Sequence, residues 1–357
     1  MTRLIEILIS LAIVAVLFVV VGVVLPSSRH LSEKIETNRK LTIVFDTLNT
    51  PRRLKDWNPL ALHDPRMQWK FTGPESGVGA TAEFNSAVPQ LGQGSWKITA
   101  SEPGERIAYD IVNNDSGTNK KTAFTFKATG RNNRNVEITQ SYDVDYGWDL
   151  IGRYRGMYVS RHVGDDIKLG LNKLTNILAS VPNYDYAEMS KDDPTKAPKA
   201  IELPAENLLF APAAVQRDNV AVQSAMSNNL QWIRKVIDAN GLESAGPVRV
   251  ITTEFGAESY AFDIAIPVRK KGETGAPSPV SPKLEGPVQF IRTEPSRVAV
   301  VPFTGHMANL PKIRDALRAW AMTRGYETTG RPFESWKAGI PESFSENGEF
   351  DVYWTLK

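Results

Sequence analysis

Residues 7–25 form one uninterrupted apolar run, ILISLAIVAVLFVVVGVVL, which contains no charged side chain. As an α-helix rising roughly 1.5 Å per residue, this run is about 28 Å long, close to the thickness of a bilayer's hydrocarbon core. Its β-branched residues are compatible with lipid, where a helix satisfies its backbone hydrogen bonds internally. Pro26 follows and ends the helix. The run therefore predicts a membrane anchor within residues 1–28, and the remaining chain must fold next to a membrane.

A cleaved signal peptide is the alternative interpretation of this run. The run is longer than the apolar region of a usual signal peptide, and the VVLPSSRHLS that follows offers no A-x-A cleavage site. The side of the membrane on which the body lies stays open, because two signals conflict. The positive-inside rule favours a cytoplasmic body, since four basic residues follow the span: Arg29, Lys34, Arg39 and Lys40. The short N-terminal head favours export of the body. We expect a single-pass protein of the inner (cell) membrane of a bacterial type, with the periplasmic side favoured for the body.

Composition excludes several chemistries in the remainder of the chain. The 357 residues include no cysteine, so disulfides and thiol catalysis are impossible, and the net charge of +2 gives no reason to expect nucleic-acid binding. SGVGATA lacks the third glycine of a dinucleotide fingerprint. The histidines are scattered without metal-ligand spacing: they are His30, His63, His162 and His306. We therefore expect no metal, no cofactor and no nucleic acid.

The first part of the body, up to residue 145, alternates short strands with turns. WKITA, ERIAYDIV, KTAFTFKAT and NVEITQSYDV are separated by turn sequences such as EPGE and GRNNRN. In the last of these strands Val136, Ile138 and Gln140 share one face. Residues 164–181 then predict a helix, because apolar residues recur at helical spacing: Ile167, Leu171, Leu174 and Leu178.

Several motifs in this part resemble the SRPBCC superfamily, the START-like, polyketide cyclase/dehydratase type of helix-grip domain. They are LKDWNPLALHDPRMQWKFTGPESGVGATAEF, GQGSWKITASEPGERIAYDI and RYRGMYVSRHVGDDIKLGLNKL, and they occur in family order. The resemblance covers residues 35–181 and implies a cavity between sheet and helix for an apolar or amphipathic small molecule. Many relatives carry a membrane segment just before this domain. The resemblance implies no particular reaction, because the superfamily contains both binders and enzymes.

Aromatic residues of this domain are the candidates to line such a cavity. Ordinary core packing is the alternative for each of them. The candidates are Trp57, Trp69, Phe71, Phe84, Trp96 and Tyr109. His63 and Asp64 are candidate polar groups at the mouth of the cavity, although a turn role for Asp64 before Pro65 fits equally well.

Residues 182–206 are rich in Pro, Lys and Asp and predict a linker. Residues 207–357 then contain two β-α-β-β units. One has a helix at 218–239 and the other at 309–323, and residues 269–286 join the units. The fold class expected for the whole chain is therefore α+β, with an N-terminal transmembrane helix, a helix-grip antiparallel sheet domain and a duplicated β-α-β-β domain.

The duplicated unit, with GYETTGRPFESW after its second helix, is similar to the GyrI-like small-molecule-binding domain found as the effector domain of AraC-type regulators. In that family an acidic residue in the strand after the second helix faces the ligand cleft, and Glu334 stands at this place. No helix-turn-helix precedes the domain here, so the regulatory role of the relatives is not carried over.

Strand alternation and the superposition of the two halves predict which residues face this cleft: Glu334, Trp336, Asp351, Tyr353, Asp263 and Arg249. Aromatic rings next to carboxylates suit a planar cation, because the ring face attracts it and the carboxylate neutralises it. Two alternatives remain open here. Glu334 could instead pair with Arg249 as a structural ion pair, or the face could be an ordinary solvated one.

The leading functional hypothesis is a membrane-anchored protein with two cavities that bind hydrophobic, cationic or aromatic small molecules for sensing, sequestration or transfer. The alternative is a hydrolase or cyclase acting on a toxic or polyketide-like molecule, with Glu334 and Tyr353 as acid–base groups. A third is a structural or interaction protein.

Overall fold

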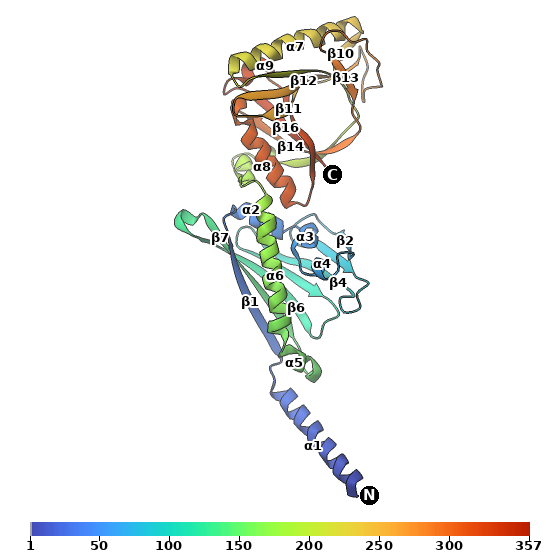
Figure 1. Cartoon of the computed structure of the whole chain (residues 1–357), viewed down its shortest axis with the longest axis vertical. Helices are drawn as coiled ribbons and strands as arrows, with labels where there is room; N and C mark the ends of the chain where they lie inside the picture. Colours follow the sequence, from blue (N-terminus) through green and yellow to red (C-terminus); the bar gives the residue numbers. More distant parts are fainter. Residues whose placement is uncertain (1) are drawn as a thin grey trace. The chain divides into compact units, whose positions relative to one another are not determined.

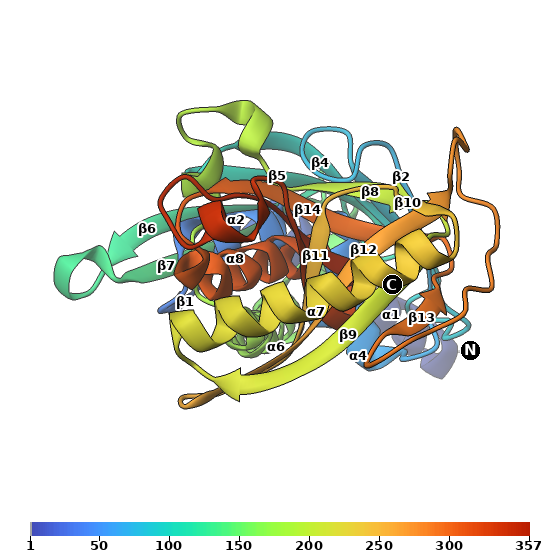
Figure 2. The same cartoon turned by 90° about the horizontal axis from the view of Figure 1, so that it is seen from above.

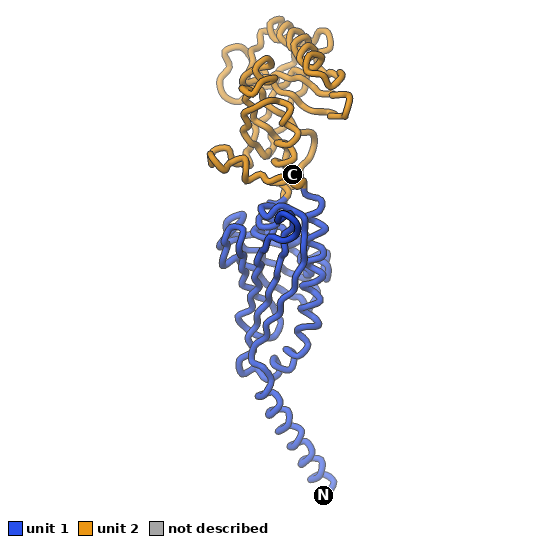
Figure 3. The backbone as a smooth tube through the Cα atoms, turned by 90° about the vertical axis from the view of Figure 1, so that its left-hand side faces the viewer, with its two compact units in different colours: residues 1–181, 323–325 blue, residues 182–322, 326–357 orange. Residues whose placement is uncertain are grey.

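The structure is a computed structural model that describes residues 2–357 and contains two compact units (Figures 1 and 3). Unit 1 comprises the chain up to residue 181 together with residues 323–325, and unit 2 comprises residues 182–322 and 326–357. Each unit is built on one antiparallel sheet with helices. This confirms the expected α+β class with an N-terminal apolar helix.

Helix α1 (Thr2–Val24) contains the apolar run and exposes nearly all of its large side chains. Among the described helices it is the one that is long and apolar enough to cross a membrane. The chain then enters strand β1 (Ser28–Thr37), whose side chains alternate between exposed and half-buried positions. This strand pairs with β7 along its whole length.

The sheet of unit 1 has the order β1-β7-β6-β5-β4-β3-β2. Short helices lie between β1 and β2 and between β6 and β7, and α5 and the long helix α6 follow β7 (Figure 1). The strands are β2 (Gln68–Thr72), β3 (Thr81–Asn85), β4 (Gln93–Glu102), β5 (Arg106–Val112), β6 (Thr118–Thr129) and β7 (Asn135–Asp145). The helices are α2 (Leu41–Leu48), η1 (Pro51–Arg53), α3 (Leu54–Trp57), α4 (Leu60–His63), η2 (Arg131–Asn133), α5 (Leu150–Gly156) and α6 (Val159–Ser180).

Helix α6 closes the core of unit 1. The apolar stripe predicted from the sequence is buried over its whole length, which confirms that prediction: Ile167, Leu171, Leu174 and Leu178. Gly164 and Gly170 on the same helix are buried too, and a Cβ on Gly170 would stand 3.0 Å from Cδ of Pro59. This close approach brings α6 next to α3 and α4, where the cavity described below opens.

Unit 2 contains a nine-stranded sheet and helix α7 packs on its strands β9 and β12 (Figure 2). The strands are β8 (Lys199–Leu203), β9 (Asn207–Gln216), β10 (Leu242–Ser244), β11 (Val248–Phe255), β12 (Ser259–Lys270), β13 (Gln289–Arg292), β14 (Ser296–Thr304), β15 (Thr328–Trp336) and β16 (Glu349–Leu356). The helices are η3 (Tyr186–Ser190), η4 (Pro194–Lys196), α7 (Asn219–Ala239), η5 (Met307–Asn309), α8 (Leu310–Thr323) and α9 (Gly339–Ser343).

The two expected β-α-β-β units are present as β9-α7-β11-β12 and β14-α8-β15-β16, and they meet where β11 pairs with β15. Residues 182–206, expected as a linker, include strand β8. This strand pairs with β14 and forms one edge of the sheet of unit 2.

Candidate functional site

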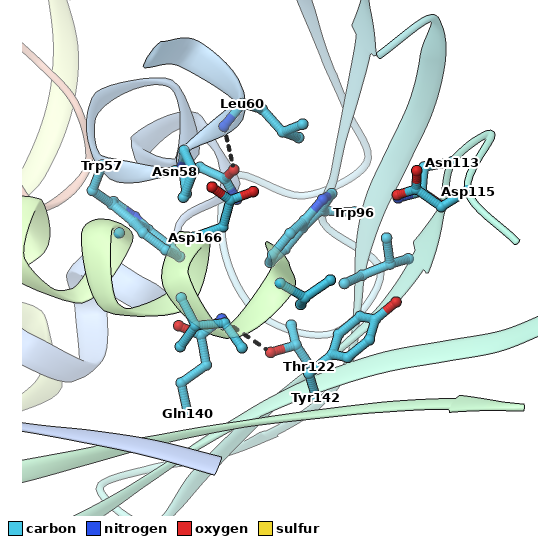
Figure 4. A pocket seen from close by; sticks show the side chains of 15 residues that line it. Trp57, Asn58, Leu60, Trp96, Asn113, Asp115, Thr122, Gln140, Tyr142 and Asp166 are labelled. Atoms are coloured by element: carbon cyan, nitrogen blue, oxygen red, sulfur yellow. Dashed lines mark hydrogen bonds between the residues drawn. The ribbon is translucent and has the colours of Figure 1, made fainter. Parts of the chain in front are cut away.

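A cavity of about 120 Å³ lies in unit 1 where the sheet, the segment of α3 and α4, and helix α6 meet (Figure 4). We call it the inner chamber. Aromatic and aliphatic side chains make up most of its wall, and a few polar groups lie among them. Its lining residues are Trp57, Asn58, Pro59, Leu60, Trp96, Ile111, Asn113, Asp115, Thr122, Gln140, Tyr142, Val163, Asp166, Ile167 and Gly170.

Two tryptophans lie on different sides of the inner chamber, and their rings flank it in Figure 4. Trp57, at the end of α3, is 1% exposed and packs edge-on against Phe124. Trp96, on β4, packs edge-on against Tyr109 at 5.7 Å between ring centroids. Both residues were predicted from the sequence to line a cavity, and both do.

Three buried polar atoms on lining residues have no hydrogen-bond partner in the protein: Trp57 Nε1, Asn58 Nδ2 and Gln140 Oε1. Each of these residues is at most 4% exposed. A buried donor or acceptor without a partner costs about 1–3 kcal/mol, and such atoms are rare in native structures. The three residues that carry these atoms all line the inner chamber.

Hydrogen bonds to neighbouring groups determine which way the side-chain amides of Gln140 and Asn58 are oriented. The hydroxyl of Thr122 donates to the carbonyl of Ser141 at 2.6 Å, so its oxygen accepts from Gln140 Nε2 at 3.2 Å. The carbonyl oxygen of Gln140 is then the free end of that amide. In the same way Asn58 Oδ1 accepts from the backbone N–H of Leu60 at 3.0 Å, which leaves Asn58 Nδ2 as a free donor. Among the lining residues, two donors and one acceptor thus have no partner within the protein.

A wider cavity of about 590 Å³ adjoins the inner chamber, and we call it the vestibule. Five residues line both spaces, so the two adjoin: Leu60, Asp115, Tyr142, Val163 and Asp166. The vestibule is also lined by residues at the end of α5 and the start of α6, among them Arg155, Tyr158 and His162. A molecule whose head occupies the inner chamber would therefore have its remaining part in the vestibule.

Polar groups lie where the inner chamber meets the vestibule. Asp166 is hydrogen-bonded to His63, with 3.0 Å between Oδ1 and Nε2. Burial, with smaller contributions from Asp115 and Tyr146, raises the pKa of the Tyr142 hydroxyl above its usual range. Tyr142 is therefore a neutral hydroxyl over the whole physiological pH range and can donate a hydrogen bond to a ligand.

Other candidates from the sequence lie elsewhere in unit 1. Trp69 does not line the inner chamber but stacks near Phe71 at 6.5 Å and borders a separate surface groove. Tyr109 is fully buried, and its hydroxyl donates to the carbonyl of Leu48. Asp64 accepts from the hydroxyl of Ser86 at 2.5 Å and from a backbone N–H in its own turn, as the turn interpretation predicted.

In unit 2, Glu334 is fully buried and does not face an open cleft. Its Oε1 accepts from Arg314 Nε of helix α8 at 2.5 Å, and its Oε2 has no partner. Burial raises the pKa of Glu334 above its ordinary value, against the opposite influence of Arg314. The alternative, an ion pair between Glu334 and Arg249, is not formed either, because Arg249 donates to both oxygens of Glu206 at 2.6 and 2.8 Å.

The predicted cleft face was wrong, because its six residues are divided between the two faces of the sheet. Residues directly opposite in an antiparallel pair share a face, and Glu334 is opposite Val352 while Trp336 is opposite Phe350. Glu334 and Trp336 thus lie on the apolar face of β16. The other four lie on the opposite face, as the register shows: Asp351, Tyr353, Asp263 and Arg249.

Three residues of that opposite face already have partners in unit 2. Asp351 accepts from Lys337 at 2.8 Å, and Asp263 accepts from Arg331 at 3.3 Å. Tyr353 stacks on Phe333 with 4.7 Å between ring centroids. Because Glu334 and Tyr353 lie on opposite faces, they cannot act together as an acid–base pair. Within residues 2–357, His, Asp and Glu form no group of three that could hold a metal ion.

Residues 28–179 match the family described as "Polyketide cyclase / dehydrase and lipid transport", and this supports a small-molecule-binding role for unit 1. None of the curated proteins matches the chain.

Three solved structures are similar to parts of the chain. The C-terminal domain of EcmrR has 17% identity and a TM-score of 0.36 over 45% of this chain and 96% of that chain. Protein CV1439 from Chromobacterium violaceum has 17% identity and a TM-score of 0.31 over 43% and 98%. Norcoclaurine synthase from Thalictrum flavum, solved with dopamine and hydroxybenzaldehyde, has 9% identity and a TM-score of 0.34 over 43% and 87%. Likenesses at these TM-scores say nothing about function.

Proposed function

We propose that this chain is a membrane-anchored protein whose unit 1 binds an amphipathic small molecule in the inner chamber and vestibule. The observation that carries the proposal is the group of unpartnered buried atoms on Trp57, Asn58 and Gln140 around an aromatic-walled cavity. A ligand that supplies the missing partners would remove their desolvation cost, and this gain would favour binding.

The cavity restricts the chemistry of the ligand. The free donors of Trp57 and Asn58 suit a carbonyl, carboxyl or hydroxyl oxygen, and the free acceptor of Gln140 suits a hydroxyl or amide hydrogen. The inner chamber of about 120 Å³ holds only a small polar head. Whole drug-sized ligands occupy about 300–1,000 Å³. The apolar body would therefore extend past Trp96 into the vestibule, where Asp115 and Asp166 could accept a cationic group.

The anchor places this binding next to a lipid phase. Helix α1 has the length and apolarity to span a bilayer once, which favours an inner-membrane protein that takes up, sequesters or transfers lipophilic compounds. The proposal places the body on the periplasmic side of that membrane. Protease treatment of intact cells against spheroplasts tests this, because a periplasmic body is digested only once the outer envelope is opened.

A second ligand surface is proposed on the face of unit 2 that carries Asp351, Tyr353, Asp263 and Arg249. The rings of Phe333 and Tyr353 stack on each other there, next to the carboxylates, and the Arg249 guanidinium lies over Phe333. A planar cation could bind beside Tyr353 by taking the place of the Lys337 ammonium on Asp351.

Displacement of a fluorescent fatty acid from the full-length protein in lipid nanodiscs tests the binding role of unit 1. Competitors are fatty acids, long-chain alcohols and phenolic ring compounds. The Trp96→Ala variant removes one wall of the chamber and is expected to weaken binding by about tenfold or more, equivalent to about 1.4 kcal/mol. Trp69→Ala is the matched control, because Trp69 lies outside the chamber.

The proposal fails if no competitor displaces the probe, or if Trp96→Ala and Trp69→Ala change the affinity equally. Circular dichroism of both variants shows whether the fold is intact, and Trp96→Leu repeats the test with less loss of volume if the alanine variant unfolds.

A further inference from the structure

Helix α5 packs directly on the membrane helix α1. The rings of Phe18 and Tyr154 stack at 4.5 Å, and the Tyr154 hydroxyl donates to the backbone carbonyl of Phe18 at 2.8 Å. Gly22 lies against Leu150 and Tyr154 so closely that a Cβ on it would stand 3.2 Å from Cβ of Leu150. Small residues permit this kind of close helix contact within membranes. The contact therefore belongs to the part of α1 that is expected to lie in lipid.

The side chain of Arg153 fixes the C-terminal end of α1 to the same place. It donates to the carbonyls of Val23 at 2.8 Å and Leu25 at 3.1 Å, and its Nε donates to the carbonyl of Gly147 at 2.8 Å. These carbonyls are the ones that a helix end leaves without intrahelical partners, and a cation is favourable there. Arg153 is only 7% exposed. The anchor is thus joined to α5 by a buried cap and not by a free tether.

These contacts set the depth of α5 in the bilayer. Phe18 lies six residues before Val24, where α1 ends, and this corresponds to about 9 Å along the helix axis. Once α1 spans the membrane, Tyr154 on α5 is drawn below the level at which the chain leaves the lipid.

The outer surface of this segment has the composition of a membrane interface. Between residues 146 and 158, four large apolar or aromatic side chains are more than half exposed: Trp148, Ile151, Met157 and Tyr158. Trp and Tyr are enriched at the level of lipid headgroups, where an apolar ring and a polar tip are both satisfied. Arg155 and Arg161 are exposed beside them and can pair with lipid phosphates. We call Trp148, Ile151, Met157 and Tyr158 the membrane-docking face.

The same segment forms part of the wall of the vestibule. Arg155 and Tyr158 line this space, and so do Val159 and His162 of the first turn of α6. If the membrane-docking face inserts into lipid, this side of the vestibule therefore lies in the layer of the lipid headgroups. Neither Trp148 nor Ile151 lines the vestibule or the inner chamber, so these two residues can be changed without altering the binding surface.

We propose that the membrane-docking face inserts into the interface of the bilayer that α1 spans and holds the vestibule against the lipid, so that an amphipathic ligand passes directly between membrane and cavity. This inference rests on the proposed membrane anchoring and ligand binding, and it adds the surface by which the body meets the lipid. The partner it names is the bilayer itself, with anionic headgroups near Arg155 and Arg161.

Site-specific labelling of the full-length protein tests the proposal. The chain has no cysteine, so Ile151→Cys can carry a single environment-sensitive fluorophore in vesicles of equal parts phosphatidylcholine and phosphatidylglycerol. Lipids with spin labels at different depths then report where the fluorophore lies. Val14→Cys in α1 reports insertion of the anchor, and Val78→Cys, in an exposed apolar position of the β2–β3 loop, is the matched control in the body.

The expected result is quenching of the label at position 151 by spin labels close to the headgroups, quenching at position 14 by deep spin labels, and no lipid quenching at position 78. Position 151 behaving like position 78 while position 14 is quenched overturns the docking surface and leaves the anchor intact. Absence of quenching at position 14 removes the anchoring, and the docking surface fails with it.

Transfer kinetics give a second, independent readout. The double variant Trp148→Ser with Ile151→Ser is expected to slow transfer of the fluorescent fatty acid from vesicles several-fold, while its affinity measured in detergent is unchanged. Equal transfer rates for the variant and the unaltered protein contradict the proposal. Loss of affinity in detergent as well would place these residues in the binding site, which also contradicts it.

Discussion

In unit 1, three residues with an unpartnered buried polar atom, Trp57, Asn58 and Gln140, line one cavity, whereas in unit 2 the buried carboxylate of Glu334 accepts from Arg314 through Oε1 and leaves Oε2 without a partner. The match to the family described as "Polyketide cyclase / dehydrase and lipid transport" lies in unit 1. The buried polar groups of the two units differ in what they face. In unit 1 the residues that carry them line a space that a ligand could fill, and in unit 2 the central acid faces a side chain of the same unit.

Two kinds of buried polar group must be distinguished: one that is paired within the protein, and one that has no partner there. A buried ion pair is weak evidence for stability or function, because desolvation offsets most of its attraction. Unpartnered donors and acceptors around a cavity have no such compensation within the protein. The cavity of unit 1 is therefore the better candidate for a ligand site, and the first tests concern whether Glu334 has a purely internal role.

The largest effect is expected for Arg314→Met, which leaves Glu334 buried without its partner. Removing one member of a buried pair costs about 3–5 kcal/mol, and chemical unfolding of the full-length protein measures this loss. The double variant Arg314→Met with Glu334→Leu is expected to recover most of the stability, because it leaves no charge to desolvate.

Ligand affinity of unit 1 should be unchanged in both variants, since neither residue lines its cavity. A single variant as stable as the unaltered protein would show that Glu334 is reached by solvent or ligand, and the contrast between the units would disappear.

The second effect concerns the free acceptor in unit 1. Gln140→Met keeps the length of the side chain and removes the amide, so ligand affinity is expected to fall about tenfold, equivalent to about 1.4 kcal/mol. The free energy of unfolding without ligand should change less, because the variant also removes an unpartnered buried oxygen. Gln289→Met, at an exposed position of β13, is the matched control for affinity. An unchanged affinity in Gln140→Met would mean that the chamber binds only through its apolar walls.

The third effect is a pH dependence. The folded-state pKa of Glu334 is raised by burial, so the folded protein binds this proton more tightly than the unfolded chain does. The contribution of Glu334 is therefore most favourable below the ordinary glutamate pKa of about 4.3 and is lost as the pH rises through the folded-state value.

Unfolding of the unaltered protein and of Glu334→Gln, compared from about pH 4 to pH 8, measures this, because other groups titrate equally in both. Relative to the Gln variant, the unaltered protein should become less stable as the pH rises. The opposite slope would mean that Arg314 holds the carboxylate ionised and that the pair attracts more strongly than burial opposes.

Sequence periodicity predicted the helices and strands of both units well. It predicted which side chains share a face only within a single helix or strand. The stripe of Ile167, Leu171, Leu174 and Leu178 is buried as expected, because one helix determines its own period. Whether Glu334 shares a face with Tyr353 depends on the register between β15 and β16, which includes a bulge between Thr329 and Phe333. No local pattern encodes that register, so the face assignment was wrong.

For a related reason, the sequence predicted only some of the residues that line the cavity of unit 1. Trp57 and Trp96 were found as aromatic residues of the helix-grip resemblance, but Asn58 and Gln140 were missed as site residues. The signal for Gln140 was present, because it continues the face of Val136 and Ile138 and is a polar residue on an otherwise apolar side. The orientation of its amide depends on Thr122 of another strand, and this information exists only in the folded chain.

The smallest effect is expected for Lys337→Ala, on the face of unit 2 opposite to Glu334. Lys337 pairs with Asp351 at 2.8 Å, and both side chains are partly exposed. Such pairs contribute about 0–1 kcal/mol, so the free energy of unfolding should change by less than about 1 kcal/mol. Removing the ammonium also frees the Asp351 carboxylate beside Tyr353, so a lipophilic planar cation should bind this face more tightly in the variant. Stability loss as large as in Arg314→Met, or weaker cation binding, would show that both faces of this sheet are closed by internal pairs and that unit 2 has no ligand surface at Asp351.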